Sequence, residues 1–435
     1  RKAMLLGAAA LLCSTTAARA IDIELNFDIG ADVDPALAAQ AQAGFEQAAR
    51  IWERRLRDPV TVRIDAGFDD LGANILGQTG STSAGVAFSD FKAALAADAT
   101  SNRDASAVAS LPGGDSFSFF TNSLGTAEGV DTFAFDSGIP GETVSTSDNS
   151  VLDVNTANLK AVGFALPDDI VDGNVTFNST FDFDFDRSDG IAPDAIDFVG
   201  VAVHELGHAL GFVSGVDTVD ILSGVGPIAD TFIRDPLAAR GLDPAALADL
   251  NVLDLLALAQ GTVNPDGSIT PENFRIFNPL DLFRFSDLSF DENGDFLGFD
   301  FTTGLGINSP LTFGDFDQQL RNRRDIPFFS IDGGDSLTAS LATGSFNGGV
   351  DFQFDNGDII GLGGSQASHF FADFGVMTPL GIMDPNFGFG ELGRITAADI
   401  AAFDAIGFDI PVPASIGFLG LGLVGFGVAA RRRRA

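Results

Sequence analysis

Two histidines four residues apart are the side chains in this sequence best suited to chemistry. They belong to the run His204-Glu205-Leu206-Gly207-His208. Positions four apart lie on one face of an α-helix, so both imidazoles can reach a single metal ion. Glu205 lies beside that face, where its carboxylate can take a proton from a water. The spacing favours zinc, which lowers the pKa of a bound water to about 7 and so generates a nucleophile near neutral pH.

A catalytic zinc ion usually has three protein ligands and one open position, so the motif needs a third ligand. Gly211 would let the chain turn back toward the metal, but the position where a third histidine would follow is Ser214, and serine is a poor zinc ligand. The carboxylates of Asp217 and Asp220 are possible substitutes. The other candidate is His369, the last of three histidines in the chain. We prefer His369 because imidazole suits zinc, and we keep Asp217 as the alternative.

The motif histidines require a helix, and the surrounding pattern predicts one over residues 194–210. Apolar residues recur there at helical spacing, and Gly211 is a natural C-terminal stop. A second amphipathic helix is predicted over residues 35–57, with Asp34 as its N-cap. Alternating apolar and polar residues from Val60 then predict a half-buried strand. These elements would supply the framework that holds the motif helix.

Phenylalanine and aspartate alternate over residues 174–186, which predicts a strand directly before the motif helix. Such a strand puts phenylalanines on one face and carboxylates on the other. Its segment 181–186 is a candidate edge for an extended peptide substrate, and an ordinary acidic edge strand is the alternative. Further helices are predicted over residues 90–97, 244–257 and 315–322, and after a capping box that begins at Thr396 and leads to a stop at Gly407.

Together these residues resemble the exported bacterial zinc metalloproteases of the metzincin type. The resemblance spans most of residues 36–410, and leishmanolysin-like members share the long insertion before the third histidine. It implies an α+β zincin fold, with a twisted mixed sheet, an active-site helix carrying the motif and a loop-rich C-terminal subdomain. It also implies a buried methionine on a tight turn beneath the histidines. Met383 is the preferred candidate for this Met-turn, and Met377 is the competing one. The 160 residues between His208 and His369 exceed the spacing of a compact metzincin.

Both ends of the sequence have the patterns of transport signals. Residues 1–20 combine a basic start, an apolar middle and small final residues, as in a secretory signal peptide. Residues 411–435 resemble PEP-CTERM sorting signals of the V-P-x-P-A variant. That resemblance implies transient membrane association, contact with the sorting and export machinery, and a location at the outer surface of a Gram-negative bacterium or outside it. The metalloprotease domain would occupy residues 21–410, with subdomains at about 21–213 and 214–410.

The chain is strongly acidic, with 60 acidic and 24 basic side chains and a formal net charge of −36. Between residues 21 and 410 the balance is 60 acidic against 17 basic side chains, a net charge of −43. Such a field repels phosphate backbones and argues against a nucleic-acid partner. Acidic turns at residues 291–295 and 332–335 are candidate calcium (Ca²⁺) loops. Neither matches an EF-hand, so ordinary turns are favoured.

The sequence therefore predicts a secreted zinc (Zn²⁺) endopeptidase that acts on protein or peptide substrates. His204, His208 and His369 would be the ligands and Glu205 the general base. The chain contains no tyrosine, so the oxyanion would be stabilised by zinc, backbone N–H groups or an arginine. One alternative is an exported matrix or adhesion protein with a structural zinc, closed by a fourth ligand such as Asp217. Another is a zinc hydrolase of non-peptide amides.

Overall fold

The structure is a computed structural model with a mixed α+β fold that contains several small sheets. The predicted helices over residues 244–257 and 315–322 lie outside the described residues, as do almost all of the two predicted transport signals. No helix in the described part of the chain is long and apolar enough to cross a membrane. The structure describes residues 20–71, 76–122, 135–136, 143–218, 237–238, 241, 243, 262–264, 269–270, 275–301, 327–342, 349–353, 359–363, 366–370 and 380–411.

A four-stranded mixed sheet forms the framework on which the motif helix packs. Its strand order is β1-β2-β9-β3, and the first three strands are parallel. They are β1 (Asp22–Ile29), β2 (Thr61–Asp69) and β9 (Gly173–Asn178). The fourth, β3 (Gly77–Ser81), runs antiparallel to β9 and forms the edge of the sheet. Strand β2 confirms the strand predicted after Val60.

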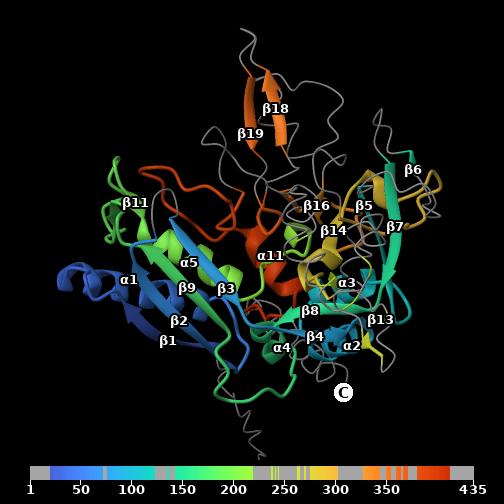
Figure 1. The fold of residues 1–435 in the computed structure, drawn as a ribbon, viewed down its shortest axis with the longest axis horizontal. Helices are drawn as coiled ribbons and strands as arrows, with labels where there is room; N and C mark the ends of the chain where they lie inside the picture. The colour runs from blue at the N-terminus through green and yellow to red at the C-terminus, as the bar shows by residue number, and fades with distance from the viewer. Residues whose placement is uncertain are drawn as a thin grey trace, which may run out of the picture.

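Two long helices lie on one face of this sheet (Figure 1). Helix α1 (Pro35–Glu53) begins where the sequence predicted, and the Asp34 carboxylate accepts hydrogen bonds from two amides of its first turn. Helix α5 (Phe198–Ala209) carries the motif. The indole of Trp52 on α1 donates a hydrogen bond of 2.9 Å to the Val203 carbonyl on α5. This bond ties the two helices together one residue before the first motif histidine.

Phenylalanine rings fill the space between the helices and the sheet. Rings from α1, from the strands and their loops, and from the first residue of α5 meet at centroid distances of 4.6–5.9 Å, in tilted or edge-on arrangements that aromatic pairs favour. The chain has 42 phenylalanines and no tyrosine, so this core contains no phenolic hydroxyl that needs a partner. The rings around the start of α5 are Phe45, Phe68, Phe177, Phe183, Phe185 and Phe198.

The strand predicted over residues 174–186 is wrong in its length, because the structure divides it. Strand β9 ends at Asn178, and a separate short strand β10 (Phe183–Asp184) pairs in parallel with β11 (Ile196–Asp197). Helix α5 therefore begins at Phe198 rather than near residue 194. The Asp184 carboxylate accepts hydrogen bonds from two backbone amides of the loop that follows β10. This aspartate therefore stabilises a turn as well as belonging to a strand.

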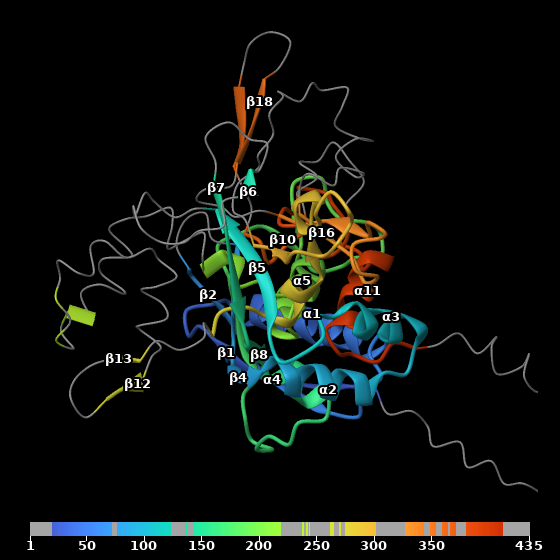
Figure 2. The ribbon, with the colours of Figure 1, turned by 90° about the vertical axis from the view of Figure 1, so that its right-hand side faces the viewer.

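The remaining elements surround this framework in smaller sheets and short helices. Figure 2 shows β5 and β7 running side by side, as their antiparallel pairing requires. Helix α2 confirms the helix predicted near residues 90–97. These elements are α2 (Phe88–Asp98), α3 (Asn102–Ser110), α4 (Thr156–Ala161), the 3₁₀ helices η2 (Pro279–Phe283) and η3 (Asp287–Ser289), and the strands β4 (Ser83–Ala87), β5 (Phe117–Asn122), β6 (Phe135–Asp136), β7 (Thr143–Asn149), β8 (Val151–Asn155), β12 (Thr262–Val263), β13 (Ile269–Thr270), β14 (Arg284–Phe285), β15 (Phe299–Asp300), β16 (Phe328–Phe329), β17 (Ala339–Ser340), β18 (Gly349–Gln353) and β19 (Ile359–Gly363).

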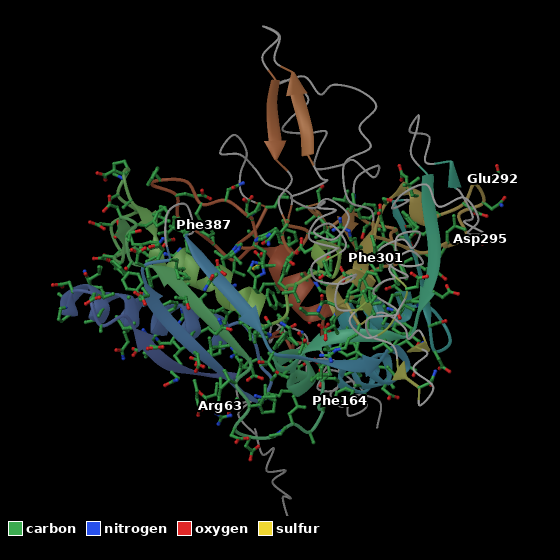
Figure 3. All side chains as sticks on the ribbon, in the orientation of Figure 1. Arg63, Phe164, Glu292, Asp295, Phe301 and Phe387 are labelled. Atoms are coloured by element: carbon green, nitrogen blue, oxygen red, sulfur yellow. The ribbon has the colours of Figure 1, made fainter. Side chains whose placement is uncertain are left out.

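In each of the two candidate calcium loops, the first aspartate accepts hydrogen bonds from its own turn. Asp291 accepts hydrogen bonds from the amides of Asn293 and Asp295, and Asp332 accepts from the amide and hydroxyl of Ser336. Figure 3 places Glu292 and Asp295 at the periphery, on the side opposite α1. Among the described residues, neither turn forms a group of side chains with metal-ligand geometry.

Helix α11 (Ala397–Ala405), the last in the described part of the chain, confirms the predicted capping box at Thr396 and packs beside α3 (Figure 2). Gly407 ends it with a φ of +110°, a conformation that favours glycine. At this contact Asp404 of α11 lies against Asp104 of α3. Burial, followed by the hydrogen bond and charge of Asp104, raises the pKa of Asp404 to about 8. The folded protein therefore holds a proton between two carboxylates at neutral pH.

We expect Asp404→Asn to stabilise the protein increasingly as the pH rises from about 4 to 8. A carboxyl with a raised folded pKa is protonated in both states at low pH, but at higher pH unfolding lets it ionise. The free energy of unfolding of the wild type thus falls by up to about 1.4 kcal/mol per pH unit. Asparagine cannot ionise, and its amide can still donate a hydrogen bond to Asp104. Urea unfolding at several pH values measures the difference, with the exposed Asp115→Asn as control. A gain that is the same at pH 5 and pH 8 would contradict this explanation.

Candidate metal centre

Helix α5 presents His204 and His208 one turn apart because both ends of the helix are anchored. At its start, the buried Asp197 carboxylate accepts a hydrogen bond of 2.9 Å from the Gly200 amide. At its end, Gly211 adopts a φ of +112°, and a Cβ atom there would lie 1.9 Å from the Asn158 side chain. Only glycine fits this turn without displacing its neighbour.

His369 reaches the motif from 161 positions further along the chain, held by backbone pairing on both sides. Its carbonyl accepts a hydrogen bond of 3.0 Å from the Ala342 amide. The next residue, Phe370, donates a bond of 2.9 Å to the Met383 carbonyl and forms a bridge with Leu341. These contacts bring His369 to the two helix histidines, and the three buried side chains form one group that could hold a metal ion.

The three Nε2 atoms converge at distances that suit a tetrahedral ion. His204 and His208 are 3.0 Å apart, His208 and His369 are 3.1 Å apart, and His204 and His369 are 3.2 Å apart between these atoms. A tetrahedral zinc with Zn–N bonds of about 2.0–2.1 Å would separate its nitrogen ligands by roughly 3.3 Å. The donor set therefore matches a small divalent ion to within a few tenths of an ångström.

Each histidine uses its other ring nitrogen to donate to a backbone carbonyl. Nδ1 of His204 lies 2.7 Å from the Ile382 oxygen, Nδ1 of His208 lies 2.7 Å from the Phe212 oxygen, and Nδ1 of His369 lies 3.0 Å from the Gln366 oxygen. A carbonyl can only accept, so the proton of each neutral imidazole belongs on Nδ1. The three Nε2 atoms then direct lone pairs at one another, an arrangement that a shared cation would satisfy.

Burial also keeps these imidazoles neutral, as metal ligands must be. Removal from solvent is the main cause that lowers the pKa of His204 and of His208 to about 4. The pKa of His369 is lowered in the same way, and the two neighbouring histidines lower it further. At pH 7 the folded chain therefore presents three unprotonated Nε2 atoms and does not have to lose protons before it binds a metal.

Met383 lies on a turn directly beneath the motif helix and is fully buried. A Cβ atom at Gly207 would lie 2.5 Å from the Met383 sulfur, so the glycine of the motif admits this close contact. The Asp399 carboxylate accepts hydrogen bonds from the amides of Ile382 and Met383 and fixes the turn. The turn then offers the Ile382 carbonyl to His204. Met377, the competing candidate, lies outside the described residues.

Asp217 lies close to the three histidines, but its carboxylate faces the backbone that carries His369. It accepts hydrogen bonds from the amides of Ala367 and Ser368 and from the Ser368 hydroxyl. Ser214, at the position of the expected third histidine, donates its amide to that same hydroxyl at 2.9 Å. The structure thus groups His369, and not Asp217, with His204 and His208. Asp220 lies outside the described residues.

Glu205 lies between α5 and the edge strand β3, at a cleft of about 600 Å³ that also includes the three histidines. The Thr79 hydroxyl of β3 donates a hydrogen bond to its carboxylate. Phe387, which is labelled in Figure 3, also lines the cleft, and its ring centroid lies 5.7 Å from that of His204. Thr79 was missed at the sequence level, because the polar run Gly77–Ser81 has no alternation that marks a strand.

The segment 181–186 does not contribute to this cleft. Residues Phe183–Asp186 line a separate hollow against α1, together with Gln40 and Gln47. The open edge beside the histidines belongs instead to β3, from which Gly77, Gln78, Thr79 and Ser81 line the cleft. The sheet edge that lines the histidine cleft therefore belongs to β3, a strand that the sequence did not indicate, and not to the Phe/Asp segment.

Comparisons with protein-family models, with curated proteins and with solved structures find no significant match to this chain. The resemblance to metzincins thus stays a prediction that rests on the motif residues. The geometry supports a more general statement. A helix carries His204 and His208, a distant segment brings His369 to them, and this buried triad could hold a metal ion.

Proposed function

We propose that this protein is a zinc-dependent endopeptidase that cleaves peptide bonds in the cleft between α5 and β3. The observation that carries the proposal is the convergence of three Nε2 lone pairs beside a carboxylate at an open cleft. Each imidazole is held in one tautomer by a backbone carbonyl, so the ligands are oriented before any metal binds. Three ligands and an accessible fourth side are typical of catalytic zinc, whereas structural sites are closed by four protein ligands.

The chain's own groups divide the proposed reaction between them. His204, His208 and His369 would hold the ion, which when bound polarises a carbonyl and lowers the pKa of a water. Glu205 accepts the proton of the attacking water and then delivers it to the leaving amine. The Thr79 hydroxyl orients the Glu205 carboxylate through its hydrogen bond. No other ionisable side chain is needed for the proton to leave the water and reach the product.

The substrate would lie along the free edge of β3. A strand at a sheet edge has unpaired backbone groups, which can bind an extended peptide as an additional strand. This placement brings a peptide carbonyl near Glu205 and the three histidines, since all line the same cleft. The described lining contains no arginine or lysine, and the chain has no tyrosine. Backbone N–H groups of β3 and the side-chain amides in the lining, among them Gln78 and Asn155, are then the protein donors available for the oxyanion.

The casein test also distinguishes two alternative functions. A matrix or adhesion protein would use a closed structural zinc, with Asp217 as the natural fourth ligand. That carboxylate already accepts three hydrogen bonds from residues 367–368, which disfavours this role. A zinc hydrolase of non-peptide amides would use the same centre on a smaller substrate. Export and surface display, inferred from the terminal segments, are part of our proposal and rest on the sequence alone.

The proposal is tested by zinc-dependent cleavage of an unstructured protein. We expect the purified chain to cut casein at internal bonds, to lose this activity when 1,10-phenanthroline removes zinc, and to regain it when zinc is added back. Mass spectrometry of the fragments identifies endopeptidase cleavage. A zinc-loaded chain that leaves casein and gelatin intact would exclude a general endopeptidase. If such a chain instead hydrolysed small acyl amides, the second alternative would be correct.

A further inference from the structure

A second cavity, of about 500 Å³, lies against α1 and α5 and shares no lining residue with the histidine cleft. Four arginines from three parts of the chain line it. Arg54 and Arg55 follow the last turn of α1, Arg187 comes from the loop after β10, and Arg394 precedes α11. Of the described residues that line the cavity, none is acidic. The chain has only 24 basic side chains against 60 acidic ones. The four arginines therefore make this cavity positively charged in a chain that is negatively charged overall.

The positive charge in this cavity is compensated at only one of the four arginines. Arg187 pairs with the buried Asp197 carboxylate at 2.9 Å, yet its Nε atom is buried without a hydrogen-bond partner. Within the described part of the chain, no carboxylate pairs with the guanidinium of Arg54, Arg55 or Arg394. Burial lowers the pKa of Arg187, and the charge of Arg394 lowers it further. The charge of Arg394 thus acts against that of Arg187, and the exposed guanidinium groups of Arg54, Arg55 and Arg394 have no carboxylate partner among the described residues.

Local structure explains part of this arrangement but not the whole. Positive side chains at the C-terminal end of a helix interact favourably with its dipole, which accounts for Arg54 and Arg55 at the end of α1. The dipole of α1 does not account for Arg187 or Arg394, which lie in loops far away in the sequence. The rest of the wall is mostly apolar, with Ile51, Val203 and Ile395 among its residues, and also includes Gln47. Guanidinium groups at a partly apolar wall bind oxyanions well, because each can offer two parallel N–H donors.

We propose that this cavity is a binding site for a multivalent oxyanion, of the phosphate or polycarboxylate class. Three uncompensated guanidinium groups suit a ligand with two or more negative charges. The volume also exceeds what a single halide ion would fill. Chloride and other simple ions would bind here only through general screening, without the paired hydrogen bonds that arginine forms with oxyanions. The site is independent of the proposed peptidase activity, because it uses none of the residues of the histidine cleft.

The test measures binding of inorganic phosphate and of tricarballylate, a tricarboxylate, by calorimetry on the full chain at constant ionic strength. We expect saturable binding of at least one of them, and about a tenfold loss of affinity in Arg394→Gln and in Arg54→Gln, which corresponds to roughly 1.4 kcal/mol. Arg50→Gln is the matched control, since Arg50 lies on α1 outside the cavity and pairs with Glu46. It should change the affinity less than twofold.

Each outcome of this experiment decides the proposal. Saturable binding of phosphate or of tricarballylate that is lost only in the cavity variants supports the site. The anion that binds more tightly then identifies the ligand class. If the anion bound instead to a zinc ion in the histidine cleft, its affinity would be equal for the wild type and Arg394→Gln. That result would overturn the proposal. An equal loss in Arg50→Gln would also overturn it, because it would indicate diffuse attraction to charge. The absence of saturable binding of either anion would reject the site outright.

Discussion

Replacing Glu205 with glutamine is expected to lower casein hydrolysis by about 10²–10⁴-fold while zinc remains at one ion per chain. Glutamine has the same shape as glutamate but cannot accept a proton from the attacking water. The three Nε2 atoms and the carbonyls that orient them are untouched by this change. Initial rates of casein cleavage and zinc content by mass spectrometry, measured on the same preparation, separate the loss of chemistry from the loss of metal.

A matched control for this variant is Glu24→Gln, which removes an exposed carboxylate from β1 far from the cleft. Its ion pair with Arg63 is solvent-exposed, so we expect activity and zinc content close to those of the wild type. If Glu205→Gln cleaved casein at the wild-type rate, the proposed role of Glu205 would be wrong. If the variant lost both activity and zinc, Glu205 would instead support the metal centre.

Replacing His369 with alanine is expected to reduce bound zinc from one ion per chain to nearly none after dialysis. The ion would keep only the two ligands on α5, and the third position would be filled by a side chain that cannot coordinate. Asp217→Asn should retain zinc at saturating concentrations but bind it about 10–100-fold more weakly. The reason is that Asp217 accepts hydrogen bonds from the backbone that carries His369, so its loss loosens the ligand without removing it.

The contrast between these two variants decides the identity of the third ligand. Competition with a zinc-sensitive dye gives the affinity of each protein, and circular dichroism checks that each variant remains folded. Loss of zinc in Asp217→Asn together with full retention in His369→Ala would make Asp217 the ligand. Equal and partial losses in both variants would mean that neither side chain coordinates zinc directly and that both act on the shape of the site.

Local sequence patterns predicted the elements that carry the site, because their signals lie within a few residues of each other. Asp34 as a cap, Gly211 as a stop and the box at Thr396 each act within one turn of a helix. The spacing of His204 and His208 likewise needs only helical geometry. The start of α5 was less predictable, because Asp197 forms both a strand pair with β10 and the helix cap.

The parts of the site that depend on distant contacts could not be derived from the sequence. Histidine scarcity favoured His369, but the backbone bridges that deliver it come from residues 341–342 and from the turn at Met383. Thr79 reaches Glu205 only because β3 pairs with β9 in an antiparallel register. No periodicity in the short polar run of β3 predicts that pairing. The cleft therefore became visible only once the sheet edge was placed beside α5.

In the proposed centre, three imidazoles of one chain bind a single zinc ion and leave one position open. X-ray absorption at the zinc edge of the purified wild-type protein tests it directly, because outer-shell scattering counts the imidazoles around the metal. We expect three imidazole nitrogens at about 2.0–2.1 Å and one further light-atom ligand from solvent. A spectrum that fits only two imidazoles, with the remaining ligands supplied by carboxylate oxygens, would contradict it.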